Sequence, residues 1–253
     1  MEVCNVHPFK VKEIPRYNMS DKYVGLLLIT YNDKENLEKM LCSFEDTIDY
    51  PTVVHIIDMG STDGTYELLL EWQKATTVSF LVDITIEHWY ELEFLTKTMN
   101  QGFKHLISRQ ECEYIGWIHP DMVFEAGWLS HLVAVFQNDA SIGKICSGNT
   151  RDGLPDSASI VPGHEQAYII RRGVLLRVGL FDERFIGIGG WEDIDMARRI
   201  IQEGWRVCIS SSSKVWHKGM ATRERRDTSE EQIHNTNEYR KKWGDNKHGE
   251  IFV

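Results

Sequence analysis

Short apolar runs that alternate with helical patterns constrain the fold of this chain more than any other feature. Residues 23–32 read YVGLLLITYN and residues 52–58 read TVVHIID, and such continuous apolar runs are typical of strands buried on both faces. The segment between them carries four apolar side chains at helical spacing: Leu37, Met40, Leu41 and Phe44. Strand, helix and strand in this order predict a parallel sheet with right-handed crossovers.

The alternation continues along the chain. We expect further strands at 78–86, 114–122 and 206–217, and further helices at 66–72, 94–108 and 128–137. Residues 165–179 predict a strand and then a short helix, the stretch from 185 leads into a helix ending near 204, and the polar tail 229–244 has helical potential. No internal repeat interrupts this order. The sequence therefore predicts an α/β protein with a mostly parallel central sheet flanked by helices.

Composition fits one large globular domain. The chain has 253 residues, 42% of them hydrophobic and 11% aromatic, which is ample for a packed core. It has no apolar run of the length that spans a bilayer and no apparent signal peptide, so we expect a cytoplasmic location. The cysteines are odd in number and scattered without a CxxC pair, so we expect them to be reduced and mostly buried: Cys4, Cys42, Cys112, Cys146 and Cys208.

The net charge of −10 argues against broad, non-specific binding of nucleic acid. The best candidate for a local basic patch is the group Arg223, Arg225 and Arg226. Glu224 and Asp227 interrupt it, which favours a solvated surface loop.

Polar residues follow three of the predicted strands. They are Thr30-Tyr31-Asn32, Asp58 and His119-Pro120-Asp121. Open α/β sheets bind ligands at the carboxyl ends of their strands, so we expect a ligand site at this edge. A carboxylate such as Asp58, followed by a Gly-Ser-Thr-Asp-Gly turn, can accept a hydrogen bond from a nucleobase or a ribose hydroxyl. The alternative is an ordinary turn in which Ser61, Thr62 or Asp63 caps the next helix.

Two further residue types at strand ends suit a divalent cation. Asp121 is a hard oxygen ligand for Mg²⁺ or Mn²⁺, and His119 lies on the same side of the strand if the extended conformation persists. His217 ends the late strand and offers an imidazole. Taken alone, a His-Pro-Asp sequence is more often a turn than a metal site, and a histidine beside a tryptophan is more often a structural residue than a ligand. The predicted metal site therefore depends on the pairing of Asp121 with His217.

Residues 185–200, FIGIGGWEDIDMARRI, crowd Glu192, Asp193 and Asp195 at a predicted helix start. The helix dipole favours acids there, and Asp195 can pair with Arg199, so a structural account exists for one or two of them. It does not explain the three glycines or the large Trp191, which we expect at the mouth of a site. A carboxylate beside an aromatic platform is what deprotonation of a sugar or alcohol hydroxyl requires.

Together these motifs resemble the GT-A glycosyltransferases, in particular the inverting enzymes of family 2, over about residues 23–219. The resemblance implies that the nucleotide sugar is bound by Thr30, Tyr31, Asn32, Asp58, Lys97, Asn100 and His119. His119 replaces the first acid of the family's Asp-x-Asp motif, so it is available to bind either ribose or metal. The resemblance further implies that Asp121 and His217 hold Mn²⁺ or Mg²⁺.

The catalytic base implied by the resemblance is Asp193. The run GGWEDID is also similar to the Gly-Gly-Glu-Asp segment of β-1,4-galactosyltransferases, which assigns acceptor contact to Glu192 and Trp191. We expect an amino-terminal extension at 1–20, a GT-A domain at 21–220 and a carboxyl-terminal helical tail at 221–253.

The expected function is metal-dependent transfer of a sugar from a nucleotide-diphosphate sugar to an acceptor hydroxyl, with inversion. The acceptor is left open among a glycan, a protein, a lipid-linked intermediate, a small metabolite and a modified nucleic-acid base, the last disfavoured by the acidity of the chain. Two alternatives also stay open. One is a nucleotide-sugar-binding protein without transferase activity, which would have no need of the Glu192–Asp193 pair; the other is a retaining transferase on the same fold.

Overall fold

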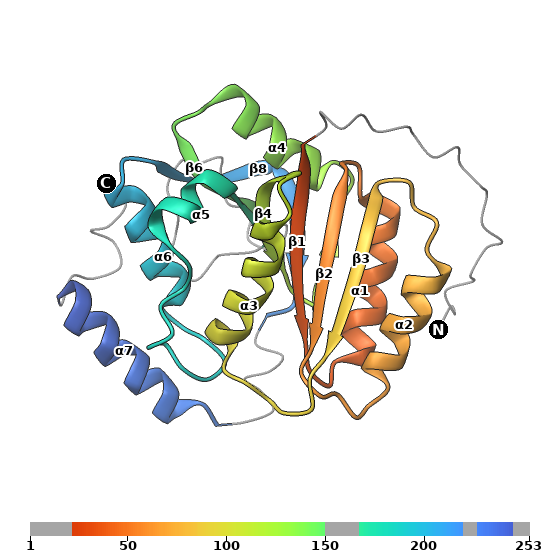
Figure 1. Cartoon of the computed structure of the whole chain (residues 1–253), viewed down its shortest axis with the longest axis horizontal. Helices are drawn as coiled ribbons and strands as arrows, with labels where there is room; N and C mark the ends of the chain where they lie inside the picture. Colours follow the sequence, from red (N-terminus) through yellow and green to blue (C-terminus); the bar gives the residue numbers. More distant parts are fainter. Residues whose placement is uncertain (1–21, 150–166, 220–226, 245–253) are drawn as a thin grey trace.

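The computed structural model describes residues 22–149, 167–219 and 227–244, and this part of the chain contains one eight-stranded sheet (Figure 1). The strands lie in the order β3-β2-β1-β4-β7-β6-β8-β5. Their bounds are β1 Tyr23–Thr30, β2 Thr52–Asp58, β3 Leu81–His88, β4 Cys112–Ile118, β5 Met122–Phe124, β6 Ile142–Asn149, β7 Tyr168–Arg171 and β8 Arg206–His217.

The sheet is parallel in its first half and mixed in its second. Strands β3, β2, β1 and β4 are mutually parallel, as predicted, and β6 is parallel to β8. Strand β7 runs antiparallel to both β4 and β6, and the short β5 runs antiparallel to β8. The prediction of a mostly parallel sheet flanked by helices is confirmed. Strand β6 was not predicted, because its sequence IGKICSGN is broken by a lysine and two glycines and lacks a long apolar run.

Helices cover both faces of the sheet (Figure 1). One face carries α1 Lys34–Thr47, α2 Thr65–Ala75 and α4 Trp128–Asn138. The other carries α3 Leu95–Ser108, α5 Arg172–Val178 and α6 Glu192–Gln202. Helix α7, Ser229–Trp243, lies outside α6. The four apolar positions predicted for the first helix are all buried, because they form the stripe of α1 that packs on the sheet.

Strands β1 and β2 are buried between the two helical layers. All seven residues of β2 are buried, and seven of the eight residues of β1 are buried. Burial of one Val, Leu or Ile side chain stabilises a fold by roughly 1.5–3 kcal/mol, so these strands fix the sheet firmly. Their carboxyl ends therefore hold the residues that follow them in defined positions.

Gly116 gives the first testable prediction, because it lies where β4 passes β7 in the middle of the sheet. A Cβ atom at this position would overlap the backbone oxygen of Tyr168, which has no freedom to move away. We expect Gly116→Ala to lower the free energy of unfolding by about 1–3 kcal/mol or more, the usual cost of overpacking. Gly173 in α5 is the matched control, since a Cβ there meets nothing within 4 Å. Gly173→Ala should raise the melting temperature through helix propensity, worth about 1 kcal/mol; melting temperatures that move in the same direction would contradict this account.

Several other expectations are settled by the fold. Cys112, Cys146 and Cys208 are buried free thiols and Cys42 is partly buried, as predicted, while Cys4 lies outside the described residues. The basic group at 223–226 also lies outside them. Among the helices that the structure describes, each is too short or too polar to cross a bilayer.

Candidate active site

Three polar residues form a row across the carboxyl ends of neighbouring strands. Thr30 ends β1, Asp58 ends β2 and His88 ends β3, and the strand register places Thr30 opposite Asp58 and Asp58 opposite His88. Asp58 is fully buried, and Nδ1 of His88 lies 2.7 Å from its Oδ2. Burial of a carboxylate is costly unless it is paired and hydrogen-bonded, so the imidazole stabilises Asp58 at the edge of the sheet.

The turn after β2 is tied to the end of β1 through Ser61. Its hydroxyl donates to Oδ1 of Asp58 at 2.5 Å and accepts the backbone N–H of Asn32 at 2.8 Å. Oδ1 of Asn32 in turn accepts the backbone N–H of Thr62 at 2.7 Å. The predicted residues Asn32 and Asp58 are therefore brought together by one serine.

The alternative, in which Ser61, Thr62 or Asp63 caps α2, is not confirmed as stated, because the N-cap is Gly64 and it has no side-chain capping hydrogen bond; Asp63 acts from the position before it. Oδ1 of Asp63 accepts hydrogen bonds from the backbone N–H of Thr65, at 3.0 Å, and from its hydroxyl, at 2.6 Å, where α2 begins. Asp63 is therefore a structural residue of the helix start.

The end of β1 presents groups that are not used in such structural bonds. The hydroxyl of Thr30 is buried and, within the described part of the chain, has no hydrogen-bond partner. Tyr31 beside it is 37% exposed, so this strand end presents groups that an incoming ligand is able to contact.

His119, Asp121 and His217 form a cluster at the same edge. One ligand atom from each lies within 4.8 Å of the others, and Nε2 of His217 is 2.9 Å from Oδ1 of Asp121. Strand β4 ends at Ile118, so the extended conformation does not continue through His119 to Asp121. The turn that follows β4 nevertheless brings the side chains of His119 and Asp121 close together. Two imidazoles and one carboxylate form a donor set that suits a first-row divalent metal such as Mn²⁺.

The protonation of this cluster also suits a cation. Burial, together with the neighbouring His217, lowers the pKa of His119 to about 3, so its ring is neutral at pH 7. Burial acts to raise the pKa of Asp121, but the hydrogen bond and charge of His217 outweigh it and leave that pKa below its ordinary value. A neutral imidazole and an ionised carboxylate are the forms that bind metals.

A second group of possible ligands, His55, Glu87 and His105, has a less suitable geometry. The rings of His55 and His105 stack with centroids 4.0 Å apart and planes at 5°. The lone pairs of imidazole lie in the ring plane, so parallel rings direct them side by side and not at one ion. Nδ1 of His55 also lies 2.8 Å from the hydroxyl of Thr85, and burial lowers the pKa of His55 to about 4. We interpret this group as packing between α3 and the sheet.

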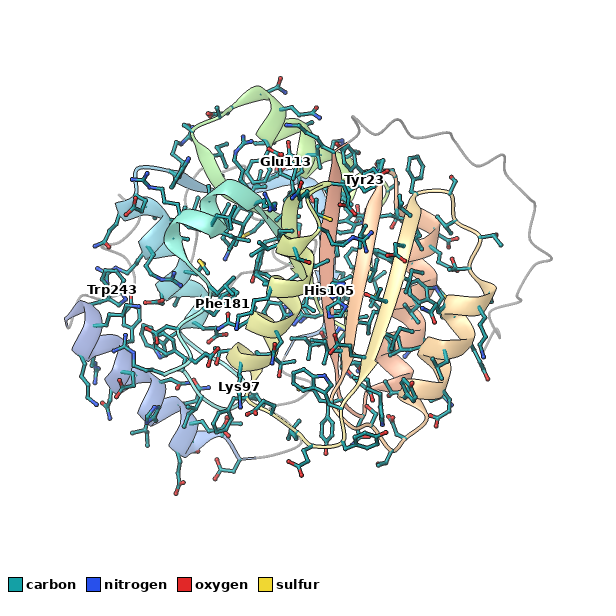
Figure 2. The ribbon with its side chains drawn as sticks, viewed as in Figure 1. Tyr23, Lys97, His105, Glu113, Phe181 and Trp243 are labelled. Carbon is teal, nitrogen blue, oxygen red and sulfur yellow. The ribbon has the colours of Figure 1, made fainter. Side chains whose placement is uncertain are left out.

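Lys97 and Asn100, predicted to approach the diphosphate, have other partners in the structure. Lys97 lies half-exposed at the amino end of α3 and pairs with Glu93 (Figure 2). The buried Asn100 exchanges hydrogen bonds with the backbone N–H and oxygen of Phe181, each 2.9 Å long, and donates to Glu183. Asn100 therefore joins α3 to the segment before α6, and its contact with the donor stays a prediction.

The segment before α6 has an unusual backbone. Gly187, Gly189 and Gly190 all have positive φ, and Trp191 has φ of 77°, which side chains rarely adopt. Glu192 begins α6, is 5% exposed and accepts a hydrogen bond from the backbone N–H of Gly190. The glycines therefore allow a tight turn that the Glu192 side chain closes.

Trp191 was expected at the mouth of the site, but its side chain packs on α7. Its ring lies 4.4 Å from that of Tyr239, and its Nε1 donates to the hydroxyl of Thr236 at 3.0 Å. The indole is partly buried by these contacts, which are structural; its predicted contact with the acceptor remains untested. The predicted pair between Asp195 and Arg199 is present at 2.9 Å.

Asp193 is connected to the metal-ligand cluster by a layer of side chains on one face of the sheet. Oδ1 of Asp193 lies 3.9 Å from Nζ of Lys144 on β6, which lies 4.0 Å from the ring centroid of Tyr168 on β7. Tyr168 pairs with Trp117 on β4, their centroids 6.1 Å apart, and Trp117 lies 4.0 Å from His119. The sequence-predicted base and the predicted metal ligands are therefore linked by consecutive side-chain contacts.

Three residues of the candidate site were missed by sequence reasoning. His88 is a polar residue at the end of a predicted strand, as Asp58 is, so the same pattern could have identified it as a site residue. Trp117 lies inside a predicted strand, and nothing in the pattern distinguishes it from other core aromatics. Its Nε1 is buried and, among the described residues, lacks a hydrogen-bond partner. Lys144 lies in the strand that was not predicted and gave no signal.

Comparisons with known proteins agree with this architecture. A mannosyltransferase from Pyrobaculum calidifontis, PcManGT, in complex with GDP-Man and Mn²⁺ superposes with a TM-score of 0.68 at 21% identity, covering 95% of this chain and 68% of that one. TarS 1–349 from S. aureus gives 0.61 at 13% identity, covering 91% and 68%. GalNAc-T7 with UDP, GalNAc and Mn²⁺ gives 0.60 at 14%, covering 87% of this chain and 55% of that one.

These likenesses establish the fold as that of the GT-A glycosyltransferases. A search of curated proteins finds no match. The model of glycosyl transferase family 2 matches residues 26–179, which is more than half of the chain and includes the strand-end row and the residues His119 and Asp121. The chain therefore belongs to glycosyl transferase family 2 and is a glycosyltransferase.

Proposed function

We propose that this glycosyltransferase moves a sugar from a nucleotide-diphosphate sugar to an acceptor hydroxyl in one inverting displacement. The observation that carries the proposal is the meeting of His119, Asp121 and His217 at the carboxyl edge of the sheet. It is joined by side-chain contacts to the carboxylate of Asp193. The proposed catalytic domain is 21–220, with α7 as a helical tail packed on it.

The donor side is proposed from the strand-end row. Thr30, Tyr31, Asn32 and Asp58 lie together at the ends of β1 and β2, where open α/β sheets bind nucleotides. The structures of similar fold were solved with GDP-Man, with UDP and with UDP-GlcNAc. These ligands support a nucleoside-diphosphate donor for the present chain and leave its base and sugar open.

The divalent ion is proposed to be Mn²⁺ or Mg²⁺, held by Asp121 and His217 with His119 beside them. Such an ion, when bound, neutralises charge that develops on the departing diphosphate. His119 supplies no fixed negative charge where an acid is usual, so the proposed ion would have one carboxylate and two imidazoles as its side-chain ligands. That composition favours Mn²⁺, for which imidazole is a better ligand than for Mg²⁺.

The base is proposed to be Asp193, which would accept the proton of the acceptor hydroxyl as its oxygen attacks the anomeric carbon. Glu192 and Trp191 are proposed to lie on the acceptor side. The acceptor class stays open among glycan, protein, lipid-linked intermediate, metabolite and modified nucleic acid, the last less favoured because the chain is acidic.

Two alternatives give different experimental results. A binding protein without activity would show donor binding and no transfer. A retaining enzyme would give the opposite anomer, which NMR of the product identifies.

The donor assignment is tested by thermal shift with nucleoside diphosphates and nucleotide sugars, with and without Mn²⁺. A ligand at 100 times its dissociation constant stabilises the folded state by about 2.7 kcal/mol, which raises the melting temperature by several degrees. We expect the correct nucleotide to give this rise only with the metal. A panel in which no nucleotide raises the melting temperature would refute the proposed donor class.

His217→Ala is the variant that tests the metal site. We expect it to weaken Mn²⁺-dependent binding of the nucleoside diphosphate at least about 10-fold, measured by calorimetry, because one of the ligands is lost. His131→Ala is the matched control, since His131 is exposed on α4 outside the cluster. An affinity unchanged in His217→Ala would remove His217 from the site.

A further inference from the structure

Lys144 is a fully buried cation in the middle of the sheet. It lies on β6 opposite Ile170 of β7, and its side chain has no exposed surface. Lysine is almost never fully buried unless it is paired, because removal of an ammonium from water is costly. Its position between apolar strands therefore calls for partners that stabilise its charge.

Two partners of Lys144 are an aromatic ring and the proposed base. Nζ lies 4.0 Å from the ring centroid of Tyr168, within the range of a cation–π contact. It also lies 3.9 Å from Oδ1 of Asp193, which is an ion pair without a direct hydrogen bond. The ammonium therefore lies beneath the amino end of α6, next to the carboxylate to which the reaction is assigned.

The two sides of the Asp193 side chain have different surroundings. Oδ1, the oxygen nearest Lys144, is buried. The side chain as a whole keeps 21% of its exposure, so its exposed surface lies on the remaining atoms. One oxygen of the Asp193 carboxylate therefore faces the buried ammonium on the inner side of the residue.

We propose that Lys144 is a positioning residue that orients the carboxylate of Asp193 and keeps it ionised. Lys144 acts through Asp193 and does not touch the substrate. A base must be unprotonated and correctly aimed when the acceptor arrives, and a fixed cation behind it favours both conditions. This inference rests on the proposed function, because it assigns Lys144 a role only if Asp193 is the base.

The test is a double-mutant cycle between Lys144→Met and Asp193→Asn. Met keeps the length and apolar stem of lysine without its charge. We expect Lys144→Met to lower kcat by about 10²-fold, the scale for misplacement of a catalytic group, with binding of the nucleoside diphosphate unchanged. In the Asp193→Asn background the same substitution should cause no further loss of kcat, because the group it positions is already gone.

Lys144→Arg provides the second variant, since it keeps the cation. We expect its kcat to lie between those of the wild type and Lys144→Met. If the Met variant does not fold, the same cycle is measured with Lys144→Arg, whose loss of kcat should disappear in the Asp193→Asn background. An equal fold-loss in both backgrounds would reduce Lys144 to a structural role and leave the proposed function intact. A wild-type kcat in Lys144→Met would overturn the inference directly. Near-normal turnover of Asp193→Asn alone would instead refute the base assignment.

Discussion

Asp193→Asn is expected to lower kcat by about 10²–10⁴-fold, the usual contribution of a general base. The amide has the shape of the carboxylate but does not accept the acceptor proton as the new bond forms. Because Asp193 lies across β6 and β7 from the metal-ligand cluster, binding of the nucleoside diphosphate should stay close to that of the wild type. Initial-rate kinetics and calorimetry measure the two quantities separately.

Asp46→Asn is the control for this substitution. Asp46 is exposed near the end of α1, at the opposite end of that helix from the strand-end row, so its loss should leave kcat unchanged. A turnover of Asp193→Asn within a few fold of the wild type would show that another group removes the proton. NMR of the anomeric centre of the product, measured on the wild type, decides separately between inversion and retention.

The first half of the fold was predictable because its strands are buried on both faces. Apolar residues fill most of β1 and β2, and the helix between them repeats its apolar positions every three to four residues. The position of the donor site also follows from this pattern, because parallel strands connected by helices have their carboxyl ends on the same side of the sheet. For this reason Thr30 and Asp58, which are 28 positions apart, were expected near each other.

The second half depends on contacts that no local pattern encodes. Strand β6 contains Lys144, and the ring of Tyr168 and the carboxylate of Asp193, both distant in sequence, help to explain why a lysine is tolerated there. The antiparallel direction of β7 likewise follows from pairing with β4 and β6 and not from its own four residues. Trp191 illustrates the same limit, since its place on α7 required knowledge of where that helix packs.

Helix α7 is attached to the segment before α6 by side chains that bond its backbone. Asn235 bonds both the N–H and the oxygen of Ile186, at 2.8 and 3.0 Å, and Gln232 donates to the oxygen of Gly189 at 2.9 Å. Polar residues on this helix therefore replace the hydrogen bonds that the irregular segment lacks within itself. The carboxyl-terminal helix thus supports the turn from which Glu192 and Asp193 begin.

Asp195 is the residue on which this attachment depends. Its carboxylate is fully buried and accepts from Nε of Arg199 at 2.9 Å, from Nζ of Lys242 at 2.6 Å and from Nε1 of Trp243 at 2.8 Å. Two of these donors belong to the last residues of α7. One side chain of α6 therefore holds the end of α7 through charge-assisted hydrogen bonds, which are the strong ones.

Asp195→Ala is expected to lower the free energy of unfolding by about 3–5 kcal/mol, because it removes the fully buried carboxylate that pairs with Arg199 and Lys242. For a chain of this size that loss corresponds to a fall in melting temperature of roughly 10 °C. Amide hydrogen exchange should accelerate at 229–243 and at 186–191 before it does in β1 and β2, since the loss is local. Glu203→Gln removes a surface partner of Arg177 and should change stability by less than about 1 kcal/mol. Equal effects of the two substitutions would mean that α7 is held by its apolar contacts with α6 and not by the buried carboxylate.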